Sequence, residues 1–362
     1  MITSMRTMLN RKYLFAVLLL AALSGCDYFV TPVHTGEKIM SELTKTMRPI
    51  CFGRLVVEIP AQARIIDGWD QEIDYTKIES VTPPSPSQKI FDAKVARLEK
   101  HLKSSPHDTE GVLFKNKIQL TPDSVLFVYR KDKSSARIYQ LDALFWRPNV
   151  EYKFHLEIST GDLTEGISMI SKVVKSFVAM PTSDLASLPP GLCVEHGVFT
   201  GSEFRGEEVA LAGRIDEYPG LGFSFQTEST DRPSEDPTMI QRIERSLGVG
   251  DEIGKEVSAA IKFIRKGKRK LNGQLGEEVV TSYTKDGRTI LDARAEFYYT
   301  APTSLDRPII NISLSDRTHD DNTHQPYNKN LTEKEFLALW DSLLNGIKPR
   351  PKNTWSGDSI LK

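Results

Sequence analysis

Cys51-Phe52-Gly53-Arg54-Leu55-Val56-Val57-Glu58-Ile59-Pro60 joins a cysteine, a glycine and an arginine to a run of apolar and β-branched residues. The run predicts a β-strand over Leu55–Ile59 that stops at Pro60. A second cysteine opens a comparable stretch further along, Cys193-Val194-Glu195-His196-Gly197-Val198-Phe199. The two openings are the first indication that the chain contains the same unit twice.

Each opening is followed by strand-like runs and a helix. The first helix is predicted over Gln88–Lys103, where apolar residues recur at intervals of four, three and four and form one stripe. The second helix is predicted over Pro237–Leu247 and is shorter, with its apolar residues on one face. The order of elements is therefore the same in both copies.

The ends of the two copies match best. Each has a predicted three-stranded meander, over 125–130, 137–146 and 151–158 in the first copy and 278–283, 289–299 and 308–314 in the second. Each meander leads to a helix that opens with Leu-Thr-Glu, so Thr164 and Thr332 are predicted N-caps followed by a glutamate in the first turn. Both helices are followed by proline, at Pro181 and Pro349.

We therefore predict an α+β fold made of two similar domains, each an antiparallel sheet packed with helices, related by internal duplication. The predicted N-terminal domain spans residues 46–182 and the C-terminal domain spans 192–351. Residues 183–191, in a stretch rich in Pro and Ser, are the predicted linker, and 352–362 are a predicted flexible tail.

The N-terminal residues have the parts of an export signal. Basic residues precede the apolar stretch Tyr13–Leu23, which is shorter than the roughly 20 residues of a membrane-spanning helix. Gly25-Cys26 resembles the bacterial lipoprotein signal, in which the chain is cut before the cysteine and the cysteine receives acyl chains such as palmitate. We predict a signal peptide over 1–25 and a lipidated tether over 26–45. The alternative is an ordinary signal peptide with a chance cysteine.

The predicted acyl chains would anchor the protein to a membrane without a spanning helix. Asp27 resembles the signal that keeps enteric-type lipoproteins on the inner membrane, facing the periplasm. That compartment is oxidising, so a disulfide between Cys51 and Cys193 is allowed, and two buried free thiols are the alternative. Neither cysteine belongs to a CxxC pair, which argues against a redox centre or a zinc site.

Composition and motifs favour binding over catalysis. The formal net charge of −1 gives no support to nucleic-acid binding. The sequence has no G-x-S-x-G, Walker or GxGxxG motif, and Gly220–Ser224 has its residues in the wrong order for a nucleophile elbow. His155 is interpreted as a structural residue of a strand. We predict no catalytic residue, metal, cofactor or small-molecule substrate. An envelope hydrolase would require folding to bring Ser, His and Asp together.

Two polar segments are candidate sites. His319 and His324 lie among aspartates in the segment Asp316–Asn330, for which a solvated loop is favoured over a metal site. The run Lys262–Lys270 could face anionic lipid, at about 1 kcal/mol per charge, or an acidic partner. The favoured alternative for this run is a solvated turn. Its candidate partner-binding residues are Lys266, Lys268, Arg269 and Lys270.

The opening Cys51–Pro60 is similar to the C-x-G-R-strand-Pro opening of type VI secretion lipase immunity proteins of group four, the two-domain lipoprotein type. The segment Gly273-x-x-Gly276-Glu277-Glu278 and the terminal helix also resemble that family, so the resemblance covers about 45–350. It implies a periplasmic, inner-membrane-anchored inhibitor that grips the cap of a cognate phospholipase toxin. Candidate contact regions are the inter-domain cleft and the loops around Lys266–Lys270 and Asp316–Asn330. The alternative is a structural lipoprotein that scaffolds envelope assembly.

Overall fold

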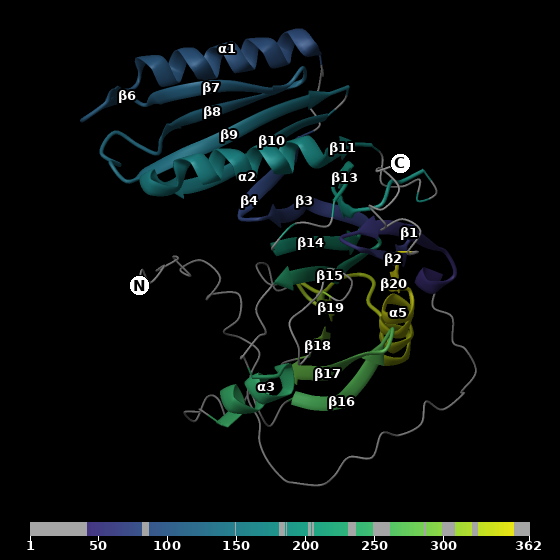
Figure 1. Cartoon of the computed structure of the whole chain (residues 1–362). Coiled ribbons are helices and arrows are strands. Elements are labelled where there is room, and N and C mark those ends of the chain that lie inside the picture. The colour runs from purple at the N-terminus through teal and green to yellow at the C-terminus, as the bar shows by residue number, and fades with distance from the viewer. Residues whose placement is uncertain are drawn as a thin grey trace.

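The computed structural model describes residues 42–81, 87–148, 150–180, 185, 187–201, 204, 206–230, 237–248, 261–285, 287–298, 308–320 and 325–350 (Figure 1). The first half contains, in chain order, η1 (Glu42–Thr44), β1 (Met47–Phe52), β2 (Leu55–Pro60), β3 (Arg64–Ile73), β4 (Thr76–Val81), α1 (Gln88–Ser104), β5 (Pro106–His107), β6 (Gly111–Val112), β7 (Phe114–Thr121), β8 (Ser124–Arg130), β9 (Ile138–Arg147), β10 (Val150–Ser159), η2 (Thr160–Asp162), α2 (Leu163–Ser176) and β11 (Phe177–Ala179).

The second half repeats this order with fewer short elements. It contains β12 (Leu192–Val194), β13 (Gly197–Phe199), β14 (Gly206–Ile215), β15 (Tyr218–Thr230), α3 (Met239–Gly248), β16 (Ile261–Leu271), β17 (Gln274–Lys285), β18 (Arg288–Phe297), β19 (Ile309–Arg317), α5 (Glu333–Asn345) and β20 (Lys348–Pro349).

One twelve-stranded antiparallel sheet runs through both halves. Its strand order is β16-β17-β18-β19-β15-β14-β3-β4-β10-β9-β8-β7, so equivalent strands lie at equal distances from the centre. The halves meet where β14 pairs with β3, from Glu207 opposite Ile73 to Arg214 opposite Arg64. The expectation of antiparallel sheets packed with helices is therefore confirmed in part: the strands are antiparallel, but the two halves share one sheet where one sheet per domain was predicted.

Alternating burial gives the sheet two distinct faces. In β17 the neighbours Glu277 and Glu278 point in opposite directions. The Glu277 carboxylate accepts from the Ile240 N–H of α3, and the Glu278 carboxylate accepts from the Trp340 indole N–H of α5. In β8, Phe127 likewise belongs to the cluster under α1, whereas Val128 belongs to the main core with α2.

We call the side with α2 and α5 the covered face and the side with α1 and α3 the exposed face. Two small sheets, β1-β2-β20 and β11-β13-β12, complete the layer on the covered face. Phe52 of β1, for example, packs against Trp69 of β3 and Phe225 of β15. Figure 1 shows α1 at one end of the long sheet and α3 near the other.

The two opening hairpins are exchanged between the halves. The β1–β2 hairpin of the first half pairs with β20, the last strand of the second half. The β12–β13 hairpin of the second half pairs with β11, the last strand of the first half. A single cluster of buried apolar side chains includes residues from both halves. Each half therefore completes the packing of the other.

Of the two predicted N-caps, one is confirmed and one is wrong. Thr332 is the N-cap of α5 and forms a capping box with Glu335, as predicted. Thr164 is not an N-cap, because the 3-10 turn η2 leads directly into α2 and makes Asp162 the cap residue. Leu43 is 1% exposed, so the packed body begins inside the segment predicted as a tether.

Candidate partner-binding surface

The opening motif lies where the two halves meet. Gly53 has φ of 56°, in the left-handed region that favours glycine, and it exchanges two backbone hydrogen bonds with Cys193, of 3.0 and 2.8 Å. A Cβ atom at this position would lie 2.7 Å from Oγ1 of Thr227. Glycine is therefore required both by the backbone conformation and by the close approach of the Thr227 side chain of β15.

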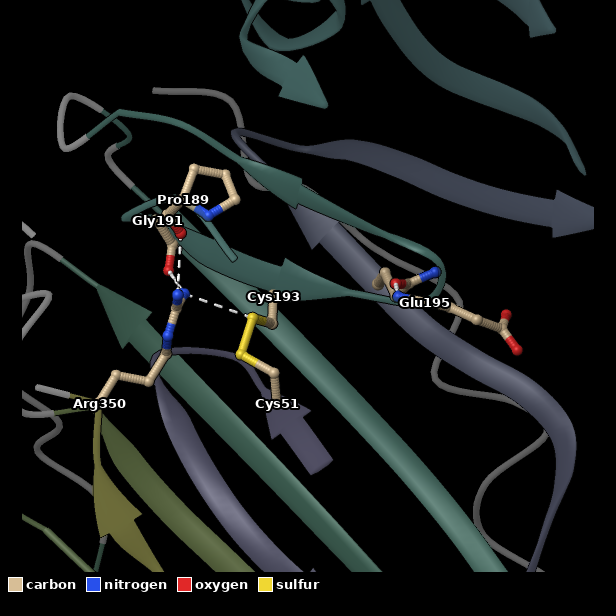
Figure 2. The surroundings of a disulfide bond; sticks show 7 residues. Cys51, Pro189, Gly191, Cys193, Glu195 and Arg350 are labelled. Carbon is tan, nitrogen blue, oxygen red and sulfur yellow. Dashed lines mark hydrogen bonds between the residues drawn. A yellow bond between two sulfur atoms is a disulfide. The ribbon is translucent and has the colours of Figure 1, made fainter. Parts of the chain in front are cut away.

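A disulfide joins Cys51 to Cys193, with a Cα–Cα distance of 5.7 Å and a sequence separation of 142 residues. Figure 2 shows the Arg350 guanidinium beside it, donating to the carbonyls of Pro189 and Gly191 at 2.8 Å and lying 3.4 Å from Sγ of Cys193. Arg350, the last described residue of the chain, thus contacts the C-terminal end of the segment predicted as a linker. This end of the predicted linker is therefore packed against the body of the protein.

A buried ion pair crosses the same junction. Arg54, in the turn of the first hairpin, donates through Nε to Oε2 of Glu207 on β14 at 2.7 Å, and its Nη2 contacts the other oxygen. Both side chains are 3% exposed. Burial raises the pKa of Glu207, and the Arg54 charge opposes that shift.

The second hairpin makes the reciprocal contacts. Glu195, in the turn between β12 and β13, accepts from the Ser80 hydroxyl at 2.5 Å, and its backbone N–H donates to Oε1 of Gln71 at 2.5 Å. The Tyr152 hydroxyl donates to the neighbouring carbonyl of His196 at 2.7 Å. Each hairpin turn is thus hydrogen-bonded to the central strands of the other half.

The basic run is an edge strand and not the turn that was favoured from the sequence. Arg265 and Arg269 point to the covered face, where both contact Asp341 of α5 and Glu278 of β17. Burial would raise the pKa of Asp341, but hydrogen bonds and charge from the two arginines outweigh it and lower the pKa. Glu278 on the adjacent strand and Asp341, which is distant in sequence, together explain why so charged a segment forms a strand.

Three lysines of this strand, Lys266, Lys268 and Lys270, point to the other side of the sheet, whereas Lys262 pairs with Glu333 of α5 at 3.1 Å. Lys266 pairs with Glu244 of α3 at 2.9 Å, while Lys268 and Lys270 are exposed. Exposed lysines on an edge strand discourage pairing with another sheet edge. Among the four basic residues proposed for a partner, Arg269 is thus directed to a structural role, and Lys266, Lys268 and Lys270 line one face.

Two histidine-containing segments bear on catalysis and metal binding. Nδ1 of His155 lies 2.6 Å from Asp142, whose carboxylate also accepts from the Tyr129 hydroxyl at 2.8 Å. Burial alone would raise the pKa of Asp142, but His155 and Lys153 help to lower it. Among the described residues, no serine completes this pair, and no group of three or more His, Cys, Asp or Glu could hold a metal ion.

The segment Asp316–Asn330 is not uniformly a solvated loop. Asp316 lies within β19, is 3% exposed, and accepts the backbone N–H of Leu331 at 2.7 Å. Burial raises its pKa to about 6. His324 lies outside the described residues, as do Cys26 and Asp27. No helix in the described ranges is long and apolar enough to cross a membrane.

Sequence reasoning named Arg54 and Glu195 only as parts of the opening stretches and did not find their partners. Glu207, Gln71 and Arg350 were not singled out at all. No local pattern marks them, since each contact joins residues more than 120 positions apart. The one available signal was Glu207 itself. It takes a position of β14 that the alternation of the strand assigns to the buried face, where a charged side chain requires a partner.

Comparison with solved structures identifies the same fold in immunity proteins. The crystal structure of the Tle4–Tli4 complex contains a chain with a TM-score of 0.73 and 21% identity, covering 86% of this chain and 99% of that one. The apo immunity protein TplEi of the type VI system of Pseudomonas aeruginosa gives 0.70 and 21%, with the same coverage. TplEi complexed with the "L" peptide gives 0.67 and 19%, covering 84% and 98%. No protein of curated function matched.

Family models match most of the chain. The N-terminal domain of Tle cognate immunity protein 4 matches residues 48–180, and the C-terminal domain of the same family matches residues 188–352. The resemblance to type VI lipase immunity proteins that the opening motif indicated is thereby confirmed at the level of the family. The chain belongs to the Tle cognate immunity protein 4 family.

Proposed function

We propose that this chain is a lipid-anchored periplasmic immunity protein that binds a type VI secretion phospholipase and inhibits it by gripping its cap. The observation that carries the proposal is the match of both immunity domains, in order, to residues 48–180 and 188–352. The complex whose immunity chain resembles this one supports a cognate lipase as the partner. The protein acts by binding and not by catalysis.

The junction gives this binding a physical basis. The shared sheet, the exchanged hairpins and the Cys51–Cys193 bond hold the two ends of the sheet in one arrangement. A preformed surface loses little conformational entropy when it binds. If that surface fits the closed cap better than the open cap, binding shifts the lipase towards its closed and inactive population.

The repeated order of elements further supports an internal duplication, in which the two copies came to share one sheet. For the anchor, we propose acylation at Cys26 and inner-membrane retention through Asp27. Confinement to the membrane surface that the toxin attacks would raise the local concentration of the inhibitor. The anchor and the binding surface are separate parts of the proposal, and each has its own test.

The binding test uses the chain from Asp27 onward and the phospholipase encoded beside its gene. Phospholipid hydrolysis is followed during titration, and the mixture is passed over a sizing column. We expect inhibition to be complete at one inhibitor per lipase and the two proteins to co-elute. Full hydrolysis with no complex would refute the proposed function and favour the envelope-scaffold alternative.

The anchoring test compares the full chain with Cys26→Ser in the producing cell. We expect the wild type to fractionate with the inner membrane and to carry acyl chains detectable by mass spectrometry. The serine variant should lack them and leave the membrane fraction. Asp27→Ser is the matched variant for sorting, because it keeps the acylated cysteine. An unacylated wild-type chain would contradict the anchor without affecting the binding proposal.

A further inference from the structure

A row of facing charges crosses the centre of the exposed face. Residues directly opposite each other on neighbouring strands lie on the same face, so the strand register traces the row. From β4 to β15 it runs Lys77, Glu72, Glu208, Glu228. Glu208 therefore has a glutamate directly opposite it on both neighbouring strands.

This arrangement is unfavourable for folding. Like charges directly opposite each other across a sheet destabilise it. Within the described strands, the Glu208 carboxylate accepts a hydrogen bond from the neutral Gln226 amide at 2.8 Å, which offsets none of this charge. A chain that breaks a local folding rule commonly does so at a functional site. The exposed residues Asp70 and Glu79 add further carboxylates to the same face of β3 and β4.

The basic residues on this face leave the centre acidic. Lys77 faces Glu72 at one end of the row, Lys153 of β10 faces Glu79, and Arg294 of β18 pairs with Asp292 of its own strand. Arg64 and Arg214 lie at the far ends of β3 and β14, and both contact the carboxylate of Asp216. An electrostatically complementary partner would therefore place positive charge over the middle of β3, β14 and β15.

Exposed apolar side chains border the same face. Val81 at the end of β4 is 54% exposed, and Leu275 at the start of β17 is 54% exposed. Ile90 of α1 is 47% exposed and lies one turn before Lys94, which pairs with Glu151, the residue opposite Val81. Three of the five large hydrophobic residues that the described part of the chain exposes thus belong to this side. Such residues are typical anchors for a protein partner.

The floor between these borders consists of small side chains. Ala210 and Ala212 of β14, Ser224 of β15 and Ser313 of β19 point to the exposed face and are half-buried. The two serine hydroxyls bond each other at 2.7 Å. Short side chains leave room above the sheet for the long side chains of a bound segment.

We propose that the exposed face between α1 and α3 receives a segment of the partner lipase that carries lysine or arginine side chains. These charges lie over the row Glu72–Glu208–Glu228, and an apolar side chain of the same segment packs against Val81 and Ile90. This inference rests on the proposed function, because it assigns the surface through which the lipase is bound. The repulsion between Glu208 and Glu72 in the free protein is relieved when the cationic segment binds.

The test is Glu208→Lys, which converts two repulsive cross-strand pairs into two attractive ones. The variant should melt about 1–4 °C above the wild type. Its dissociation constant for the lipase encoded beside the gene should nevertheless be roughly 10- to 100-fold weaker at 150 mM salt. The wild-type affinity should fall as salt rises, and this dependence should be smaller in the variant. Greater stability with weaker binding cannot be attributed to misfolding.

The matched control is Glu165→Lys, an identical charge change at an exposed position of α2, on the covered side. Its affinity should stay within about twofold of the wild type, since it lies away from the row. If the wild type binds the lipase and Glu208→Lys binds it equally well, the assignment of the binding surface to this face is refuted, while the proposed function stands. If the wild type forms no complex, the proposed function fails and this inference fails with it.

Discussion

Replacing Arg54 with methionine would leave Glu207 buried without its charged partner. Both side chains are 3% exposed, and the pair is bidentate, so the remaining carboxylate has no access to water. Breaking a buried ion pair from one side costs about 3–5 kcal/mol, because an uncompensated charge remains. We expect Arg54→Met to lose this amount in urea unfolding at pH 8. Arg54→Met/Glu207→Gln should recover about 2 kcal/mol of it, since the amide carries no charge.

The sign of the pH dependence provides a second readout. Without Arg54, burial raises the folded-state pKa of Glu207 further above its unfolded value. A group of this kind contributes stability that is complete below its unfolded pKa and is lost as pH rises through the folded pKa. Arg54→Met should therefore be closer to the wild type at pH 5 than at pH 8. A loss under 1 kcal/mol at pH 8, or a double variant no more stable than Arg54→Met, would refute the reasoning.

Three other predictions concern stability. Cys51→Ser/Cys193→Ser should lower the unfolding free energy by about 5 kcal/mol on the chain-entropy model, given the separation of 142 residues, and reduced wild type should match it in urea titration. Burial raises the pKa of Asp316 to about 6 from the ordinary 3.8. The contribution of Asp316 to the unfolding free energy is therefore complete below about pH 4 and is lost as the pH rises through about 6. Asp316→Asn should then be more stable than wild type by up to about 2–3 kcal/mol at pH 7.5, and equal near pH 4; an equal gain at both values would contradict this. Thr332→Ala should cost about 1 kcal/mol in thermal melts and Thr164→Ala little, because Thr332 alone of the two is an N-cap.

The elements that local periodicity specifies were predicted closely. The apolar stripe placed a helix over Gln88–Lys103, and α1 spans Gln88–Ser104. The capping residues located the start of α5 at Thr332. The same reasoning failed at Thr164, where η2 extends the helix backwards, and at Lys262–Lys270, whose composition resembles a turn. The arginines of that strand are stabilised by Asp341, which is distant in sequence.

The candidate surface was only partly accessible from the sequence. The basic run and the two cysteines were recognised because composition and motif spacing mark them. Glu72, Glu208 and Glu228 were not, because each is an ordinary glutamate in its own strand. They become a row only after β3, β14 and β15 take their register.

The sequence by itself determined the family, the repeated order of strands and helices, and most of the positions at which they begin and end. These features depend on side-chain periodicity within one element and on short motifs. The tertiary structure decided that the halves share one sheet, exchange their opening hairpins and bring Arg54 to Glu207. Periodicity predicts which face of a strand is buried, but it does not predict which other strand will pair with it. That choice depends on how buried area and hydrogen bonds are satisfied across the whole chain.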